Sequence, residues 1–109
     1  MRFDVECVRD CLVRNGIVFT VRGWKYENEW CKSDLGDLGE RWLKRILVKE
    51  VSSKADLVDY VKLSGFDSVE EWFRVIEGFC RGKRKWLYVV FVPALGVVGS
   101  LVTNMKTGF

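Results

Sequence analysis

The segment after Gly65 carries the strongest helix signal in the chain. Ser68 is followed three residues later by Glu71, a capping-box spacing in which each side chain satisfies a backbone N–H group at a helix start. Glu70 and Glu71 also place negative charge near the positive end of the helix dipole. Apolar residues then recur at helical spacing: Trp72, Phe73, Ile76, and Phe79 or Cys80. The pattern predicts an amphipathic helix that packs one face on a core.

Length and composition favour one folded domain. The chain has 109 residues, of which 49% are hydrophobic and 30% charged, proportions typical of a globular domain rather than a disordered segment. We expect a single domain over residues 1–109, with a core at about 4–93 and a C-terminal extension at 94–109. The net charge of +3 permits an anionic partner but falls short of a strongly basic nucleic-acid-binding surface.

The apolar stretches are too short to cross a membrane. The longest, residues 86–98, is interrupted by Pro93 and Gly96 and falls short of the roughly 18 apolar residues that mark a spanning helix. Acidic residues, Glu6 among them, stand near the N-terminus, where a signal peptide has an apolar run. The sequence therefore predicts a cytoplasmic protein without a membrane partner.

The cysteines and the missing histidine limit the chemistry. Cys7, Cys11, Cys31 and Cys80 form no Cys-x-x-Cys pair, and the chain has no histidine. We therefore expect no metal site and no cofactor, and every mechanism that needs histidine is excluded. Cys7 and Cys11 share one face of a helix, where buried thiols act as small apolar groups. A disulfide between Cys31 and Cys80, as tolerated in some thermophile cytosols, stays an alternative.

A helix and two strands are expected in the first half of the chain. Asp4 can cap the helix, and Asn15-Gly16 supplies the left-handed residue that commonly ends one. The expected buried positions of this helix are Val5, Val8, Cys11 and Leu12. Residues 17–21 are β-branched and aromatic, which favours a strand. Residues 23–37 show no period and form the longest candidate loop, and residues 43–51 are expected to form the next strand.

Two helices and a strand are expected in the second half. Ser53 and Asp56 repeat the capping-box spacing and open a helix that ends at Gly65. Its expected buried residues are Leu57, Val58 and Val61. After the second helix comes an apolar strand over residues 86–92, and residues 95–102 are a candidate for one more. Helices gathered between β segments indicate an α+β fold, with a small curved sheet or barrel that carries helices on one side.

The order of these elements and several short motifs resemble those of one known family. Thr20-Val21-Arg22 stands where that family has a Thr-x-Arg strand, and Gly36-Asp37 precedes the next strand. Ser64-Gly65-Phe66 and Ser68-Val69-Glu70-Glu71-Trp72 match its late loop and helix, and residues 86–92 match its closing strand. The family is the ASCH domain, within the PUA-like superfamily. The resemblance implies a small PUA-like β-barrel with flanking helices, in an intracellular and archaeal-like protein.

The chain departs from the family's amidohydrolase branch at two catalytic positions. In that branch a lysine and a glutamate act with the strand threonine as nucleophile. This chain has Ile17 or Val18 at the lysine position and Ser64 at the glutamate position. Thr20 alone remains, and an isolated threonine hydroxyl is a weak nucleophile without an adjacent base. We therefore expect no catalytic residue, and a small amidohydrolase that acts on a modified nucleoside through Thr20 stays the enzymatic alternative.

The leading hypothesis is a non-catalytic module that binds RNA or a nucleotide, as the resemblance implies, in a basic, aromatic-lined cleft. The residues expected to bind are Thr20, Arg22, Trp24, Lys25 and Tyr26, with Arg84 and Lys85 as a second contact. A cation beside an exposed ring can hold a phosphate while the ring stacks on a base. Against this, Trp24 can instead pack in the core and Arg22 can pair with Glu27 or Glu29, while the run 81–85 can be only a solvated turn. A protein-interaction domain anchored by surface tryptophans is the third hypothesis. Neither the ligand nor the oligomeric state follows from the sequence.

Overall fold

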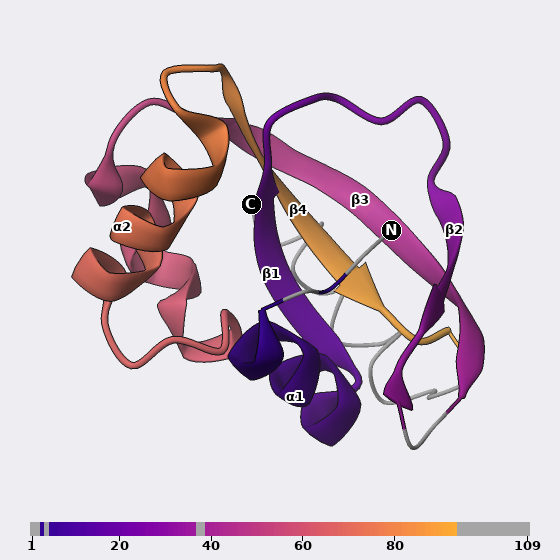
Figure 1. The fold of residues 1–109 in the computed structure, drawn as a ribbon. Coiled ribbons are helices and arrows are strands. Elements are labelled where there is room, and N and C mark those ends of the chain that lie inside the picture. Colours follow the sequence, from indigo (N-terminus) through magenta and orange to yellow (C-terminus); the bar gives the residue numbers. More distant parts are fainter. Residues whose placement is uncertain (1–2, 4, 37–38, 94–109) are drawn as a thin grey trace.

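The computed structural model of the chain describes residue 3, residues 5–36 and residues 39–93 (Figure 1). Its elements in chain order are α1 (Glu6–Asn15), β1 (Ile17–Arg22), β2 (Trp30–Asp34), β3 (Glu40–Val51), the 3₁₀ helix η2 (Lys54–Leu63), α2 (Val69–Cys80) and β4 (Lys85–Phe91). The strands form one antiparallel sheet in the order β1-β4-β3-β2. The α+β class is therefore confirmed. Within the described residues the sheet is open, with β1 and β2 as its edges.

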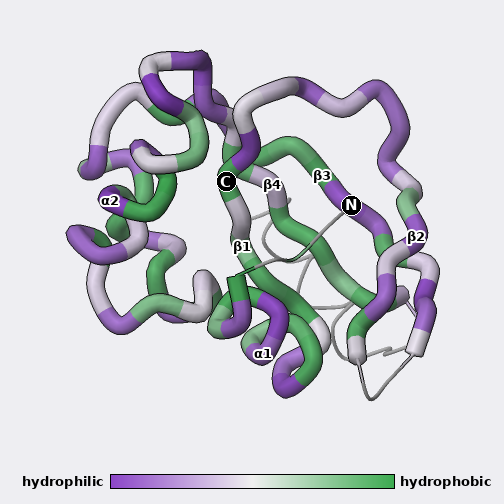
Figure 2. The backbone as a smooth tube through the Cα atoms, in the orientation of Figure 1, coloured by the Kyte–Doolittle hydropathy of each residue, from purple (hydrophilic) through white to green (hydrophobic). Residues whose placement is uncertain are grey.

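The hydrophobic core is centred on β1 and β4. These two strands pair from Ile17 opposite Phe91 to Arg22 opposite Trp86, and most of their residues are buried. Figure 2 shows them as two adjacent hydrophobic segments, while α1 and α2 alternate between hydrophobic and hydrophilic residues. The 3₁₀ helix η2 contributes to the same core, because the Tyr60 ring lies 5.0 Å from the ring of Phe19. The helices thus lie toward the β1 edge, and β2 forms the opposite edge (Figure 1).

The predicted helix ends agree with the structure where it describes them. Ser68 accepts a hydrogen bond from the Glu71 backbone N–H at 3.2 Å, as the capping spacing predicted. Gly16 adopts a φ of 74° and its N–H donates to the Leu12 carbonyl, which ends α1. On α2 the choice between Phe79 and Cys80 resolves clearly: Cys80 is buried, whereas Phe79 is 68% exposed.

The prediction of one loop over residues 23–37 is wrong for its second half. Residues 30–34 form β2, which alternates exposed and buried side chains and pairs with β3. Its inward positions hold Cys31 and Ser33 rather than β-branched residues, so the sequence gives little strand signal. The pairing with β2 also extends β3 back to Glu40, ahead of the predicted start of that strand.

The helix predicted from Ser53 is a 3₁₀ helix, and this changes its buried face. At three residues per turn, positions three apart share a face, so Leu57 is followed inward by Tyr60 and Leu63. The prediction that Val58 is buried is therefore wrong, since its side chain is exposed. The Asp56 carboxylate does accept a hydrogen bond from the Ser53 N–H, as the capping pattern predicted.

Three remaining expectations concern single features. All four cysteines are free thiols, so the alternative of a disulfide between Cys31 and Cys80 is wrong. The cap expected at Asp4 and the strand expected at 95–102 lie outside the described residues. In the described part of the chain, every helix is too short or too polar to cross a bilayer.

Candidate functional site

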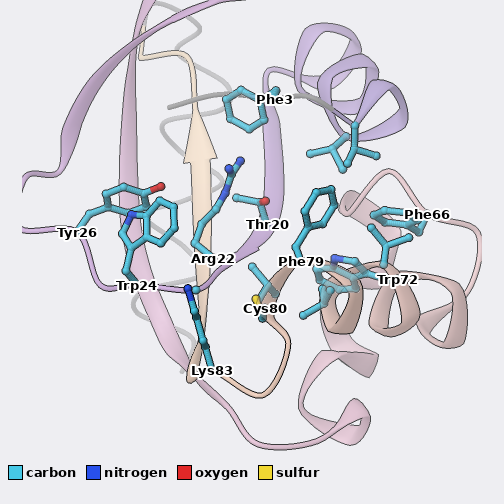
Figure 3. A pocket seen from close by; sticks show the side chains of 16 residues that line it. Phe3, Thr20, Arg22, Trp24, Tyr26, Phe66, Trp72, Phe79, Cys80 and Lys83 are labelled. Atoms are coloured by element: carbon cyan, nitrogen blue, oxygen red, sulfur yellow. The ribbon is translucent and has the colours of Figure 1, made fainter.

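A cavity of about 540 Å³ lies between the outer edge of β1 and helix α2 (Figure 3). This volume falls in the range of about 300–1,000 Å³ that is usual for small-molecule sites. The lining comes from the N-terminal residues with α1, the end of β1, the loop that follows β1, the segment before α2, and α2 with the turn behind it. β1 is an edge strand of the described sheet, because it pairs only with β4. Helix α2 packs beside this edge but leaves space between itself and the strand, and this space is the cavity.

Aromatic rings form two opposite walls of the cavity. On one side Trp24 and Tyr26 meet edge to face, with their ring centroids 6.0 Å apart. On the other side Phe66 and Trp72 stack at 6.4 Å, and Phe79 lies nearer the solvent. Figure 3 shows the two groups facing each other across the cavity. Aromatic walls of this kind suit a planar ring, because aromatic rings contact one another favourably in stacked or edge-to-face arrangements.

The alternative that Trp24 packs in the core is wrong, since 60% of its side chain is exposed. Its ring lies at the mouth of the cavity rather than beneath it. Trp72, by contrast, is almost fully buried, so its ring belongs both to the core and to the wall.

The polar groups of the cavity are few and come mostly from β1. Thr20 and Arg22 are two residues apart on the strand and therefore point to the same face. The Arg22 guanidinium lies over the Phe3 ring, 5.2 Å from its centroid, and Lys83 approaches from the turn after α2 (Figure 3). Among the described lining residues the charged side chains are these two cations, so the local field favours an anion.

The chemistry available to Thr20 is limited in this setting. Its hydroxyl is buried, and the described lining includes no carboxylate that would act as its general base. The Cys80 thiol also lines the cavity, but burial raises its pKa and keeps it protonated near neutral pH. The arrangement therefore suits binding of a ligand better than a covalent reaction with it.

The loop that carries Trp24 and Tyr26 is fastened to the sheet. The Tyr26 N–H donates to the Tyr88 hydroxyl oxygen at 2.6 Å, and the Arg45 guanidinium lies 3.7 Å from the centre of the Tyr26 ring. Arg45 is buried, and its Nε donates to the Asn28 carbonyl at 2.8 Å. Sequence reasoning missed Arg45 because a basic residue within an alternating strand is usually interpreted as exposed. The register that places Arg45 opposite the buried Val90 is seen only in the structure.

Lys25 and Arg84, two of the predicted cations, lie together but away from the cavity. Both approach the Trp86 ring, Lys25 at 5.4 Å and Arg84 at 4.7 Å from its centroid. Arg84 also forms a two-point ion pair with Glu50, at 2.7 and 2.9 Å. Hydrogen bonding to Arg84 lowers the pKa of Glu50, and the same bond raises the pKa of Arg84. The positive charge of Arg84 is thus largely neutralised.

Lys85, the remaining predicted cation outside the cavity, is also paired with another residue. Its amine lies 3.0 Å from a carboxylate oxygen of Glu77, and its side chain is 13% exposed. The structure thus brings Thr20, Arg22, Trp24 and Tyr26 into one cavity and leaves Lys25, Arg84 and Lys85 outside it. Arg84 and Lys85 were expected to form a second contact, but Lys83 is the residue of this basic run that lines the cavity.

Comparison with protein-family models, with curated proteins and with solved structures finds no match for this chain. The resemblance to the ASCH family accordingly stays a prediction that depends on the short motifs of the sequence.

Proposed function

We propose that the protein is a non-catalytic module that binds a nucleotide, either free or as an exposed unit of single-stranded RNA, in the cavity beside β1. One observation carries the proposal: two cations and a threonine stand between two aromatic walls in a cavity of suitable volume. A nucleotide joins a flat aromatic base to an anionic phosphate, and this cavity offers a complementary group to each.

Each lining residue has a distinct part in this proposal. The rings of Trp24 and Tyr26 stack on the base, and such stacking contributes about 1–3 kcal/mol per base in single-strand binders. Arg22 and Lys83 hold the phosphate, Arg22 with a planar fork and Lys83 as a point charge. Thr20 supplies a hydroxyl that both donates and accepts hydrogen bonds, which suits a base edge or a sugar hydroxyl.

The resemblance to the ASCH family supports the same proposal at the level of fold. Thr20 and Arg22 stand at the positions of its Thr-x-Arg strand, and both line the cavity. A PUA-like barrel, an RNA-binding role and a cytoplasmic location form part of the proposal. Closure of the barrel would need a further strand beside the open edge of β1 or of β2.

The test is a titration of the protein with nucleosides, nucleoside monophosphates and inorganic phosphate, followed by intrinsic tryptophan fluorescence and calorimetry. We expect a monophosphate to bind more tightly than its nucleoside, and phosphate alone to bind weakly. Arg22→Gln should weaken monophosphate binding about 10-fold or more, because a charged hydrogen bond contributes about 1.5–3 kcal/mol. Lys83→Gln, at an exposed turn position, should weaken it about 2- to 5-fold.

Lys62→Gln is the matched control, because Lys62 is an exposed cation of η2 that does not line the cavity. Its affinity for the monophosphate should equal that of the wild type. Equal affinities for the nucleoside and its monophosphate, or equal losses in the Lys83 and Lys62 variants, would contradict the proposal. Binding to neither nucleotide nor RNA at low salt would favour a protein partner instead.

A further inference from the structure

The exposed face of β2 and β3 carries two tryptophans and two lysines in an alternating pattern. Trp30 lies opposite Lys44, and Lys32 lies opposite Trp42, in consecutive same-face pairs of the antiparallel ladder. Side chains directly opposite each other on a sheet face are about 5 Å apart at Cβ, and diagonal neighbours about 7–8 Å. The two rings are therefore diagonal neighbours, each with a lysine beside it. We call these four residues the tryptophan–lysine face.

The two tryptophans are exposed although tryptophan has the largest apolar side chain of any residue. Half of the Trp30 surface and 58% of the Trp42 surface remain in contact with solvent. The buried side of β2 is occupied by the small side chains of Cys31 and Ser33. Trp30 points to the opposite face and contributes nothing to that buried side. Large rings kept on a surface are typical of sites that contact a partner.

Each lysine is placed over the ring that it accompanies. The Lys44 amine lies 5.5 Å from the centroid of Trp30, and the Lys32 amine lies 5.6 Å from that of Trp42. Such a contact holds the ammonium group next to the ring in a defined direction. The face thus repeats one unit twice: an aromatic surface with a positive charge at its side.

We propose that the tryptophan–lysine face binds single-stranded nucleic acid, separately from the cavity beside β1. A single strand repeats a flat base and a negative phosphate, and proteins that bind it combine aromatic stacking with cations along the backbone. At the Trp30 end, where Lys44 lies away from Asp34 and Glu40, charge complementarity favours this occupant over a protein, because the cores of protein interfaces are depleted in lysine. Among the described strands β2 is an edge of the sheet, so in that part of the chain no further strand borders the face on its outer side.

Two acids lie at the turn end of the tryptophan–lysine face and make its two ends unequal in charge. Glu40 lies opposite Asp34 in the register, and its carboxylate is 3.3 Å from the Lys32 amine. This ion pair lowers the net charge beside Trp42, whereas Lys44 and Trp30 lie farther from both acids along the ladder. The Trp30 end is therefore the stronger half of the site, and Glu40 acts against binding.

The test measures a short fluorescent oligouridylate by anisotropy across a salt series, with wild-type protein and with Trp30→Ala, Trp42→Ala and the double variant. Loss of one stacked base corresponds to about a 5- to 150-fold weaker binding. We expect losses in this range, larger for Trp30→Ala, while Trp30→Phe retains most of the affinity because a ring remains. Lys44→Gln should reduce the slope of log K against log[salt] by about 0.7.

Glu40→Gln gives a change in the opposite direction. Removal of the acid should tighten oligouridylate binding several-fold, which loss of structure does not do. Lys62→Gln is the matched control for Lys44→Gln, because Lys62 is an exposed cation of η2 that lies outside both proposed sites. It should change neither mononucleotide binding nor oligouridylate binding by more than about 2-fold.

Different experimental results would overturn the two proposals. Unchanged oligouridylate affinity in the Trp30 and Trp42 double variant overturns the proposal for the tryptophan–lysine face, whatever the mononucleotide does. Lack of mononucleotide binding overturns the cavity proposal and leaves the proposed face standing if the double variant loses the oligouridylate. Circular dichroism and thermal melting of each variant confirm that a loss of affinity comes from a folded protein.

Discussion

Replacement of Gly65 by alanine tests the junction that joins the cavity wall to α1. Gly65 adopts a φ of +91°, and a Cβ built on it lies 2.8 Å from the carbonyl carbon of Cys7 and 3.0 Å from the Cα of Val8. These are backbone atoms, which cannot rotate away, so α1 must shift. The positive φ costs an L residue about 1–2 kcal/mol. Overpacking against a rigid neighbour adds about 1–3 kcal/mol.

The expected loss in the free energy of unfolding for Gly65→Ala is therefore about 2–5 kcal/mol, from a total of about 5–15 kcal/mol for a domain of this size. Urea unfolding followed by tryptophan fluorescence measures it. With an m-value of about 1.5 kcal/mol per molar, the midpoint should fall by about 1–3 M. The monophosphate affinity should fall as well, because Val8 and Phe66 both line the cavity.

Substitutions at two other glycines distinguish the cost of the positive φ from the cost of the steric clash in the free energy of unfolding. Gly82 has a φ of +81° but no atom within 4 Å of a built Cβ, so Gly82→Ala should cost only the conformational term, about 1–2 kcal/mol. Gly78 lies within α2 with open space around it, so Gly78→Ala should stabilise the protein by about 0.5–1 kcal/mol. A Gly65→Ala variant no less stable than Gly82→Ala would refute the close approach to α1.

Two further substitutions address the loop anchor and the pH dependence. Tyr88→Phe removes the acceptor of the Tyr26 N–H and should destabilise the protein by about 1–3 kcal/mol and weaken mononucleotide binding. Thermal melting and the nucleotide titration would show this, and unchanged values in both would contradict the anchor. The N–H groups of Ser52 and Ser53 and the Lys49 amine lower the pKa of Asp56 from 3.8 to about 2. A lowered folded-state pKa gives a stabilisation that is present above pH 4 and lost as the pH falls from about 4 to 2. Urea unfolding of Asp56→Asn across this range should therefore lack that part of the pH dependence, and a slope equal to that of the wild type would count against it.

The elements with strong local signals could be predicted from the sequence. Ser68, Glu71 and Gly16 carry caps whose hydrogen bonds involve only neighbouring residues, so the helix ends follow from local chemistry. The apolar segments of β1 and β4 are strands because β-branched and aromatic residues dominate both of them. In contrast, β2 depends on pairing with β3, and its small inward residues give no local signal.

The candidate site could be predicted only where one strand and its loop supply it. Thr20, Arg22, Trp24 and Tyr26 follow one another in the chain, so a single prediction placed them together. The other wall comes from α2, whose Trp72 and Ile76 were interpreted only as core residues. Lys83 was passed over because four cations stand near the same turn. Which of them reaches the cavity depends on the ion pairs that Arg84 and Lys85 form with acids of other elements.

Arg45 connects the two proposed sites and allows a test of both at once. Sequential strands β1 and β2 lie at opposite edges of the sheet, so the loop between them carries Trp24 and Tyr26 at one end and leads to Trp30 at the other. Arg45 fastens the middle of this loop: its Nε donates to the Asn28 carbonyl, and its guanidinium lies over the Tyr26 ring.

Arg45→Met keeps the apolar part of the side chain but removes the hydrogen bond and the charge, a loss of about 1.5–3 kcal/mol for a charged donor. We expect weaker binding of both the mononucleotide and the oligouridylate, whereas Trp30→Ala weakens only the binding of the oligouridylate. An Arg45→Met protein that binds both ligands as the wild type does would show that the loop holds its place without this anchor. Because the Arg45 backbone N–H still bonds the Glu29 carbonyl in the variant, the experiment isolates the side chain from the strand pairing.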